Sequence, residues 1–312
     1  MMGEIMSETI DLAIIGAGPA GLTAGLYGAR GGLGVVIFEA VAAGGQLAQT
    51  DRVDNYPGFP EGAEGFQLAW DMRTQAERFG ATILTENVES VDFSSDPKRI
   101  VTSGGTYEAR QVIVASGAHP RKLGLDLEDK LRGRGVSYCA TCDGGFFRGK
   151  DVVVVGGGDT AAADALYLSR LCRKVYLVHR RDKLRATQIY HARLAETENV
   201  EFVWNSEARE LVANENGAVS GLVVRNKQTG EDRTLEASGV FVAVGTVPNT
   251  AFLGGQLNLD PAGYIVADES GKTNVPGVYA AGDVRTKTLR QVVTAVSDGA
   301  ECAQIACEQA SI

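Results

Sequence analysis

The chain has 312 residues, of which 44% are hydrophobic and 22% charged, and its formal net charge is −9. This length suffices for two domains with separate cores, and the negative charge argues against nucleic acid or an anionic membrane surface as a partner. The chain start lacks the pattern of a signal peptide, no stretch approaches the roughly 20 apolar residues of a membrane helix, and five scattered cysteines form no disulfide scaffold, so we expect a cytoplasmic protein.

The first predicted elements form a strand, a glycine-rich turn, a helix and a second strand. A buried strand at 10–15 (IDLAII) is followed by GAGPAG at 16–21, a helix of small residues, and a strand VVIFE that ends at Glu39. The glycines allow the backbone to approach a pyrophosphate at the helix N-terminus, and an acid about 20 residues further on binds ribose hydroxyls. The pattern predicts a nucleotide with a free ribose, FAD or NAD, although an ordinary glycine-rich turn remains an alternative.

The same order recurs between residues 151 and 181, with G-x-G-x-x-A running from Gly156 to Ala161. His179 stands where the first unit has its acid. Three arginines follow in the segment HRRDKLR, namely Arg180, Arg181 and Arg185. Arginine forks accommodate a ribose 2′-phosphate, so this unit predicts NADP, and a solvated charged turn is the alternative.

Each unit ends in an apolar strand that runs into small residues and proline, QVIVASGAHPR at 111–121 and GVFVAVGTVPN at 239–249. We interpret these segments as crossovers between domains. The predicted fold is α/β, with two Rossmann-like nucleotide-binding domains, the second inserted in the first. The expected domains are 1–118, 119–248 and 249–312, of which the first and last form one unit.

A third signal is VPGVYAAGD at 275–283, a predicted strand that ends in glycine and Asp283, before a helix near RQVVTAV at 290. The acid could bind polyol hydroxyls, and the helix N-terminus could stabilise negative charge on a reduced ring system. Asp283 could equally be a turn residue or an N-cap.

The segment YCATCDGGFF places Cys139 and Cys142 in a C-x-x-C pair followed by Asp143. Zinc needs four ligands, and the chain has no second C-x-x-C and no histidines spaced as a ligand pair. A purely structural disulfide is rare in the cytosol. A redox pair fits a chain with two nucleotide fingerprints, while the isolated cysteines are expected in the core: Cys172, Cys302 and Cys307.

The motifs GAGPAG, GGQL, CATCDG, GGGDTA, HRRDKLRA and AAGDV stand in the order found in low-molecular-weight thioredoxin reductases, which the chain resembles over essentially its whole length. The resemblance implies FAD in the outer domain, NADPH in the inserted one, a homodimer and thioredoxin as the substrate. It implies a FAD site of Gly16, Gly18, Pro19, Ala20, Gly21, Glu39, Gly44, Gly45, Gln46, Leu47, Asn55, Gly117, Gly282, Asp283, Arg290, Gln291 and Val292. It implies an NADPH site of Gly156, Gly158, Asp159, Thr160, His179, Arg180, Arg181 and Arg185.

The resemblance also implies a mechanism. Hydride passes from NADPH to FAD, the disulfide is reduced, and Cys139 attacks the partner while Cys142 lies nearer the flavin. Asp143 is expected to move the proton, with capping of a short helix as its alternative role. The chain departs from many relatives at Gly145. Rotation of one domain about the two crossovers is expected, because the cysteines and the nicotinamide site share one domain and one flavin.

Residues beside the pair are candidates for docking the partner: Arg134, Phe146 and Phe147. The main alternatives keep the fold and change the partner to a peroxiredoxin or glutaredoxin-like protein, or the donor to NADH or ferredoxin. An oxidase that passes electrons to oxygen and a non-catalytic nucleotide sensor or structural zinc protein are further alternatives. The arginines favour NADPH, and the intact second glycine motif disfavours the oxidase.

Overall fold

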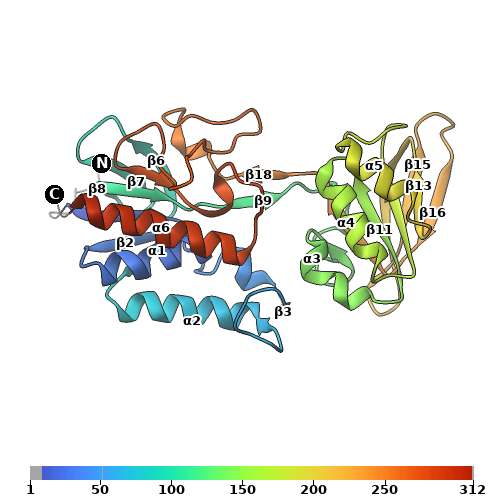
Figure 1. Ribbon diagram of the computed structural model, residues 1–312, viewed down its shortest axis with the longest axis horizontal. Helices are drawn as coiled ribbons and strands as arrows, with labels where there is room; N and C mark the ends of the chain where they lie inside the picture. Colours follow the sequence, from blue (N-terminus) through green and yellow to red (C-terminus); the bar gives the residue numbers. More distant parts are fainter. Residues whose placement is uncertain (1–8, 51, 311–312) are drawn as a thin grey trace. The chain divides into compact units, whose positions relative to one another are not determined.

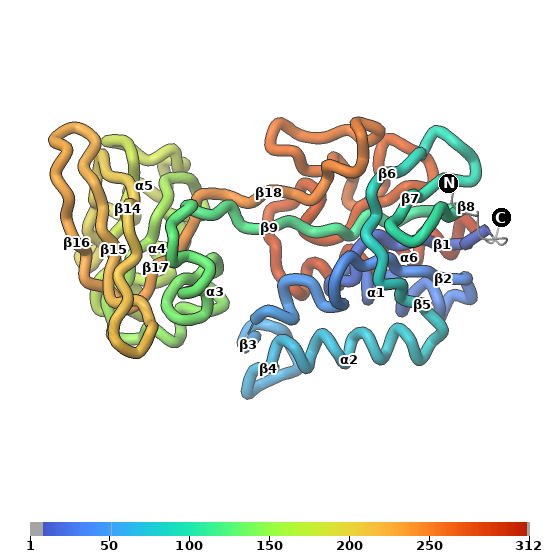
Figure 2. Tube along the Cα trace, turned by 180° about the vertical axis from the view of Figure 1, so that it is seen from behind, coloured from blue at the N-terminus to red at the C-terminus, as the bar shows by residue number. Residues whose placement is uncertain are grey.

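A computed structural model of the chain describes residues 9–50 and 52–310. The expectation about the start of the chain rests on residues 1–8, which lie outside the described residues. The polypeptide divides into an outer unit, Met1–His119 together with Val247–Ile312, and an inserted unit, Pro120–Thr246. Figures 1 and 2 present the elements of each unit from two sides.

The outer unit is built on a mixed sheet in the order β5-β2-β1-β8-β7-β6, with β19 also paired to β8. Its strands are β1 (Ile10–Ile15), β2 (Val35–Glu39), β5 (Thr82–Thr85), β6 (Val88–Asp92), β7 (Lys98–Thr102), β8 (Thr106–Val114) and β19 (Val278–Ala280). The strands β5, β2, β1, β8 and β19 run parallel, and β6 and β7 continue the sheet antiparallel. The carboxyl ends of the parallel strands therefore meet at one edge of the sheet, where ligands bind in such folds.

Alternate residues of β1 serve different cores. Leu12 and Ile14 face the core shared with α1 (Pro19–Arg30) and α6 (Val292–Ala310), which lie side by side in Figure 1, whereas Ala13 faces the core built with β6 and β7. The two helices approach closely because Gly299 of α6 has no side chain: a β-carbon there would overlap the backbone of Ala20.

The remaining elements of the outer unit are short, apart from α2 (Gly65–Arg78). They are η1 (Leu47–Gln49), β3 (Arg52–Val53), β4 (Ala63–Glu64), η3 (Ala251–Leu253) and η4 (Gly282–Val284). Leu47 and Val53 pack with Leu68 of α2 in a small separate core. This core anchors the segment between β2 and α2 beside the first glycine-rich turn.

The inserted unit has a fully parallel sheet in the order β10-β17-β11-β12-β13. Its strands are β10 (Val136–Ser137), β11 (Asp151–Gly156), β12 (Lys174–Val178), β13 (Val200–Val203) and β17 (Gly239–Ala243). The antiparallel strands β14 (Ser206–Ala213), β15 (Val219–Asn226) and β16 (Asp232–Glu236) form a second sheet. The other elements are α3 (Ala140–Asp143), η2 (Gly144–Phe147), α4 (Asp159–Ser169) and α5 (Gln188–Ala195).

The valines of β11 show why this unit has three layers. Val152 and Val154 pack in one core with Ala161 of α4, while Val153 and Val155 pack in another core with the three-stranded sheet. Successive strand side chains point to opposite faces, so a run of valines is covered on both sides. The predicted α/β fold with two Rossmann-like units is confirmed.

The chain passes between the units along β9 (Ala118–Pro120) and β18 (Thr246–Pro248), which pair with each other. Gly117 and Gly245 flank these strands with φ of +68° and +107°, a region that favours glycine. Within the described ranges, none of the helices combines the length and apolarity needed to cross a bilayer.

Candidate active site

The first glycine-rich turn joins β1 to α1, and its glycines have two different structural roles. A β-carbon on Gly16 would overlap the carbonyl of Ala115, and one on Gly21 would overlap the carbonyl of Gly16. A β-carbon on Gly18 would meet no described atom within 4 Å. Gly16 and Gly21 therefore allow close backbone packing, and Gly18 leaves backbone open for an approaching phosphate.

The second turn, between β11 and α4, repeats this arrangement. A β-carbon on Gly156 would overlap the carbonyl of Ala243 and lie 2.6 Å from the β-carbon of Ala161. Around Gly158, in contrast, no atom of the described chain would come within 4 Å of an added β-carbon. Both units thus present an open backbone corner at the N-terminus of a helix, where anions bind.

Glu39 lies at the carboxyl end of β2 beside the first turn. Its Oε2 accepts a hydrogen bond from the backbone N–H of Ala17 at 2.9 Å, and its Oε1 accepts one from Val41 at 3.2 Å. Each carboxylate oxygen has a further lone pair. The side chain is thus held in place with acceptor capacity left for ribose hydroxyls.

The segment Gly44–Leu47 packs against the first turn. The backbone N–H of Gly44 donates to Ala17 O at 2.7 Å, and Gly45 is close enough that its β-carbon would lie 3.3 Å from the α-carbon of Gly18. Gln46 donates from Nε2 to Ala118 O at 2.6 Å, next to Gly117. Many of the residues predicted for FAD thereby gather at one sheet edge.

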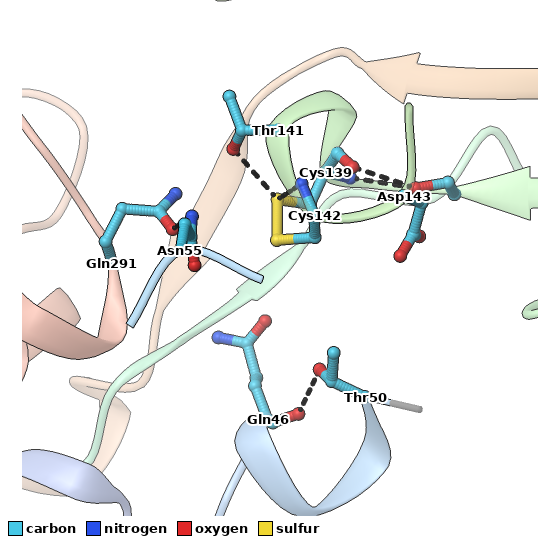
Figure 3. Close-up of a disulfide and its surroundings, with 9 residues drawn as sticks. Gln46, Thr50, Asn55, Cys139, Thr141, Cys142, Asp143 and Gln291 are labelled. Carbon is cyan, nitrogen blue, oxygen red and sulfur yellow. Dashed lines mark hydrogen bonds between the residues drawn. A yellow bond between two sulfur atoms is a disulfide. The ribbon is translucent and has the colours of Figure 1, made fainter. Parts of the chain in front are cut away.

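Asn55 and Gln291 come from distant parts of the sequence and hydrogen-bond at 2.9 Å from Nδ2 to Oε1 (Figure 3). Val292 packs with the small core that contains Leu47. The predicted FAD residues Leu47 and Asn55 are therefore brought close to Gln291 and Val292, although more than 200 residues of sequence separate the two pairs.

Asp283 lies in the turn η4, after β19. Its Oδ1 is buried with no hydrogen-bond partner among the described residues, and burial raises the pKa of the carboxyl while Lys287 and Arg290 lower it. Arg290 donates to Asp283 O at 3.4 Å and stacks 4.0 Å above the Tyr264 ring. The N-cap alternative is wrong, because Ala281 caps this turn, and the orphaned acceptor fits a ligand hydroxyl.

Sequence reasoning missed a charged cluster behind this turn. Asp298 of α6 accepts from Gly282 N–H at 2.8 Å and from Lys287 Nζ at 2.7 Å, and its Oδ1 lies 3.7 Å from Arg285. All three side chains are at most 15% exposed. The cluster fixes the backbone that carries Asp283. No short sequence motif predicts this cluster.

In the inserted unit, the segment after β12 folds back onto the second turn. The backbone N–H of Arg185 donates to Gly157 O at 2.7 Å, and that of Thr187 donates to Asp159 Oδ1 at 2.6 Å. Three arginine side chains are exposed there: Arg180, Arg181 and Arg185. Thr160, in the first turn of α4, is also exposed. This leaves a positive, accessible edge beside Gly158.

His179 differs from its arginine neighbours because its ring is buried, at 5% exposure. The imidazole occupies the space that a β-carbon on Gly157 would need, and it meets Trp204 edge to face at 6.4 Å. Burial lowers its pKa, and Nε2 has no partner among the described residues. The side chain supports the turn from within, and direct contact with the cofactor stays a prediction.

Cys139 and Cys142 form a disulfide across α3, with α-carbons 5.3 Å apart (Figure 3). Cys139 is the N-cap of α3, and its Sγ accepts from Cys142 N–H at 3.2 Å and lies 3.4 Å from Thr141 Oγ1. An N–H aimed at Sγ and the positive end of a helix both favour a thiolate. These contacts would stabilise a thiolate at Cys139 in the reduced pair, and its attack on a partner stays a prediction.

Asp143 closes α3. Its Oδ2 accepts a hydrogen bond from Ser137 Oγ at 2.6 Å, and its backbone N–H donates to Cys139 O at 3.1 Å. Asp143 occupies the N-cap position of the short helix η2, as the alternative role predicts, but its side chain makes no cap hydrogen bond there, and the cap of α3 is Cys139. The carboxylate is instead tied to the segment that precedes the redox pair.

The loop after Asp143 has one exposed and one buried aromatic side chain. Phe146 is 52% exposed, whereas Phe147 is 9% exposed and packs edge to face on Phe241 at 5.3 Å. The expectation that Phe147 docks a partner is therefore wrong, since its ring belongs to the core. Gly145 and Arg134 are exposed, and a β-carbon on Gly145 would meet no described atom within 4 Å.

The isolated cysteines are packing residues. Cys172 and Cys302 are buried in separate cores, and Cys307 is half-buried. Burial raises the pKa of Cys172 to about 11 and that of Cys302 to about 12. These thiols are therefore protonated and unreactive at neutral pH, which confirms the predicted core role of the two buried ones.

Comparison with known proteins gives the family. Residues 10–299 match the family model described as pyridine nucleotide-disulphide oxidoreductase. The chain belongs to this family. A thioredoxin reductase of Streptomyces clavuligerus is 49% identical over 301 residues, which cover 96% of this chain and 93% of the relative.

Comparison with solved structures also finds proteins named as thioredoxin reductases. Thioredoxin reductase from Streptococcus pyogenes matches with a TM-score of 0.90 at 41% identity, covering 98% of this chain and 99% of that one. A ferredoxin-flavin thioredoxin reductase from Clostridium acetobutylicum matches with a TM-score of 0.53 at 33% identity, covering 99% of each chain. The chain is thus a flavin-dependent oxidoreductase of a family whose members use FAD and NADPH.

Proposed function

We propose that this protein reduces oxidised thioredoxin with electrons from NADPH, through FAD and the Cys139–Cys142 disulfide. The observation that carries the proposal is the disulfide at the start of α3, in the same unit as an open glycine turn flanked by arginines. Relatives named thioredoxin reductase, at 45–49% identity, support the choice of substrate.

The outer unit has the features that a bound FAD requires. The open backbone at Gly18 suits the pyrophosphate, Glu39 suits the ribose hydroxyls, and the orphaned Asp283 oxygen suits a hydroxyl of the ribityl chain. FAD, when bound, supplies two-electron transfer between the nicotinamide and the disulfide. The residues proposed around it are Gly16, Pro19, Ala20, Gly21, Gly44, Gly45, Gln46, Leu47, Asn55, Gly117, Gly282, Arg290, Gln291 and Val292.

The NADPH site is proposed at the second turn. Gly156 lets the turn pack closely on Ala243 and Ala161, and Gly158 leaves the backbone open to the pyrophosphate at the N-terminus of α4, beside Asp159 and Thr160. The three exposed arginines would hold the 2′-phosphate, because guanidinium forks bind phosphate oxygens bidentately. His179 is retained in the proposed site as the support beneath Gly157.

The chemical step at the reduced pair balances two electrons and two protons. Cys139, as the thiolate, attacks one sulfur of the thioredoxin disulfide, so that a mixed disulfide forms and a thiolate leaves. Asp143 donates a proton to that leaving thiolate. Cys142 then attacks Cys139 Sγ, which restores the Cys139–Cys142 disulfide and releases the second thioredoxin sulfur as a thiolate, while Asp143 recovers a proton from the Cys142 thiol. That thiolate takes up from solvent the proton that Cys139 released when it ionised, so thioredoxin ends as a dithiol.

Reorientation of the units is part of the proposal, because one flavin must serve both the nicotinamide and the disulfide. The hinges would be the crossovers at Gly117–Arg121 and Gly245–Asn249, where the strands β9 and β18 pair. A cross-link that holds the units in one orientation should stop turnover after a single half-reaction. Turnover at the normal rate in the cross-linked protein would refute the rotation.

A homodimer and a cytoplasmic location complete the proposal; the homodimer rests on the resemblance to the family, and the location rests on the composition and cysteine usage of the sequence. Light scattering at micromolar concentration tests the first, with a mass of twice 32.9 kDa expected. Localisation of a tagged chain by cell fractionation tests the second.

The test of function compares electron donors and acceptors on the flavin-loaded protein. NADPH should reduce the flavin and oxidised thioredoxin should reoxidise it, whereas NADH and reduced ferredoxin should be much slower donors. Ferredoxin is included because one solved relative is named for it. Flavin reduction by ferredoxin alone would contradict the assignment of NADPH. Reoxidation by a glutaredoxin-like protein or a peroxiredoxin alone would contradict the assignment of thioredoxin.

A further inference from the structure

Ser137 lies two residues before Cys139, at the end of β10, and is only 5% exposed. Its Oγ is 2.6 Å from Asp143 Oδ2 and 3.1 Å from the backbone nitrogen of Cys139. A single buried hydroxyl therefore joins the proposed proton carrier to the main chain of the proposed nucleophile.

The direction of both hydrogen bonds follows from the atoms involved. The backbone N–H of Cys139 can only donate, so Ser137 Oγ accepts from it. The one hydroxyl hydrogen is then aimed at Asp143 at 2.6 Å rather than at Cys139 O at 3.3 Å, because the carboxylate is the closer and stronger acceptor. The contact between Asp143 N–H and Cys139 O, at 3.1 Å, closes the ring.

We propose that Ser137 is a positioning residue for thiol–disulfide exchange, which holds the Asp143 carboxyl group at a fixed place relative to Cys139. This inference rests on the proposed function. It adds a residue that sequence reasoning did not single out, and its effect on the reaction runs through Asp143.

The hydroxyl serves both proton transfers without entering the bond changes. When the leaving thiolate of thioredoxin takes a proton from Asp143, the carboxylate that forms accepts the Ser137 hydrogen. When the Cys142 thiol later gives its proton to Asp143, the carboxylate is already oriented by the same bond. The proton count of the cycle is unchanged, because Ser137 keeps its own hydrogen throughout.

The strand itself does not need the hydroxyl. Ser137 pairs with Phe241 of β17 in the parallel sheet, and this pairing is made by backbone groups. Ser137→Ala should therefore keep β10 and the disulfide while it removes the hydrogen bond from Ser137 Oγ to the Asp143 carboxylate. Ser206→Ala is the matched control, since Ser206 is also buried in the inserted unit but its Oγ donates only to the backbone of Trp204, at 2.8 Å.

The experiment measures reactivity of the reduced pair against pH in the flavin-loaded protein. The probe is iodoacetamide, with the modified cysteine identified by mass spectrometry, so the readout does not depend on the physiological partner. Ser137→Ala should shift the pH midpoint of alkylation upward, because the Ser137 hydroxyl no longer offsets the negative charge of the Asp143 carboxylate, and a nearby negative charge disfavours a thiolate. Ser206→Ala should leave the midpoint unchanged, and Ser137→Thr should restore it.

A double-mutant cycle with Asp143→Asn tests whether Ser137 affects exchange through Asp143. In single turnovers with oxidised thioredoxin, Ser137→Ala should slow exchange about tenfold, a part of the 10²–10⁴ that general acid–base catalysis contributes. In the Asp143→Asn background, Ser137→Ala should have no further effect. Equal midpoints for Ser137→Ala and Ser206→Ala, or additive effects with Asp143→Asn, would overturn the proposal.

The two hypotheses fail separately. If thioredoxin is not the substrate, wild-type protein will not reduce it, but the shift in the alkylation profile will remain. If Ser137 only stabilises the fold, wild-type turnover will be normal, and the alkylation midpoint will not move.

Discussion

The Glu39 carboxylate accepts a hydrogen bond from the backbone N–H of Ala17, with Oε2 and the nitrogen 2.9 Å apart. This contact ties the end of β2 to the glycine-rich turn after β1, so that one side chain both stabilises the turn and presents its remaining lone pairs beside it. The acid that we propose as the ribose contact is therefore held in place by the fold itself.

Glu39→Ala should lower the affinity for FAD by about 10- to 100-fold, since hydrogen bonds to a charged group contribute roughly 1.5–3 kcal/mol. The measurement is flavin fluorescence on dilution of the purified protein. Glu89→Ala, which removes an exposed acid of β6, is the control and should retain FAD. Equal retention in both variants would show that Glu39 does not bind the ribose.

Replacement of Arg181 and Arg185 by alanine should raise KM for NADPH about 100-fold and leave KM for NADH nearly unchanged, because only NADPH carries the 2′-phosphate. The backbone bond from Arg185 to Gly157 survives this change. Arg193→Ala, at an exposed position of α5, serves as the control for loss of an exposed arginine in the same unit. A parallel rise in both KM values would place the 2′-phosphate elsewhere.

Burial raises the pKa of Asp164, on α4, to about 7, from an ordinary value of 3.8. The folded protein therefore prefers the protonated form, and the stability this gives is present below about pH 4 and lost as pH rises toward 7. Asp164→Asn should raise the melting temperature at pH 8 and have little effect near pH 4. The gain at pH 8 should be about 1 kcal/mol, because the residue keeps some solvent exposure.

Asp182→Asn, at an exposed position, controls for the loss of a charge in the same unit. A stabilisation of the Asp164 variant that is the same at both pH values would contradict the titration and indicate a packing effect.

Asp298→Asn should destabilise the outer unit by about 3–5 kcal/mol, because it leaves the buried cations of Lys287 and Arg285 without their counter-charge. FAD should also dissociate more readily, since Gly282 and Asp283 lose their anchor. Melting temperature and flavin retention provide the two readouts. The added change Lys287→Met should recover part of the loss, and a purely additive double variant would show that the two side chains do not interact.

The elements tied to short-range patterns could be predicted from the sequence. The valine run of β11 and the open corners at Gly18 and Gly158 follow from alternation and from glycine spacing, which express local steric rules. The redox pair was predictable from context, since a C-x-x-C without a second pair of zinc ligands, in a chain with two nucleotide fingerprints, favours redox chemistry.

Other features depend on contacts between distant segments. Asp298 hydrogen-bonds to Gly282 over a sequence separation of 16 residues, and Gln46 hydrogen-bonds to Ala118 over a separation of 72. No sequence motif predicts either contact. The burial of His179 and Phe147 follows from the layers that cover them, Trp204 in one case and Phe241 in the other. Sequence position beside a functional motif does not determine whether a side chain faces solvent.

The central claim is that electrons travel from NADPH to thioredoxin through Cys139 and Cys142. The most direct measurement is flavin absorbance in an anaerobic stopped-flow experiment, with NADPH added first and oxidised thioredoxin second. We predict rapid bleaching by NADPH in wild type and in Cys142→Ser, and reoxidation by thioredoxin in wild type alone. Reoxidation of Cys142→Ser at the wild-type rate would contradict the account, because electrons would then reach thioredoxin without the disulfide.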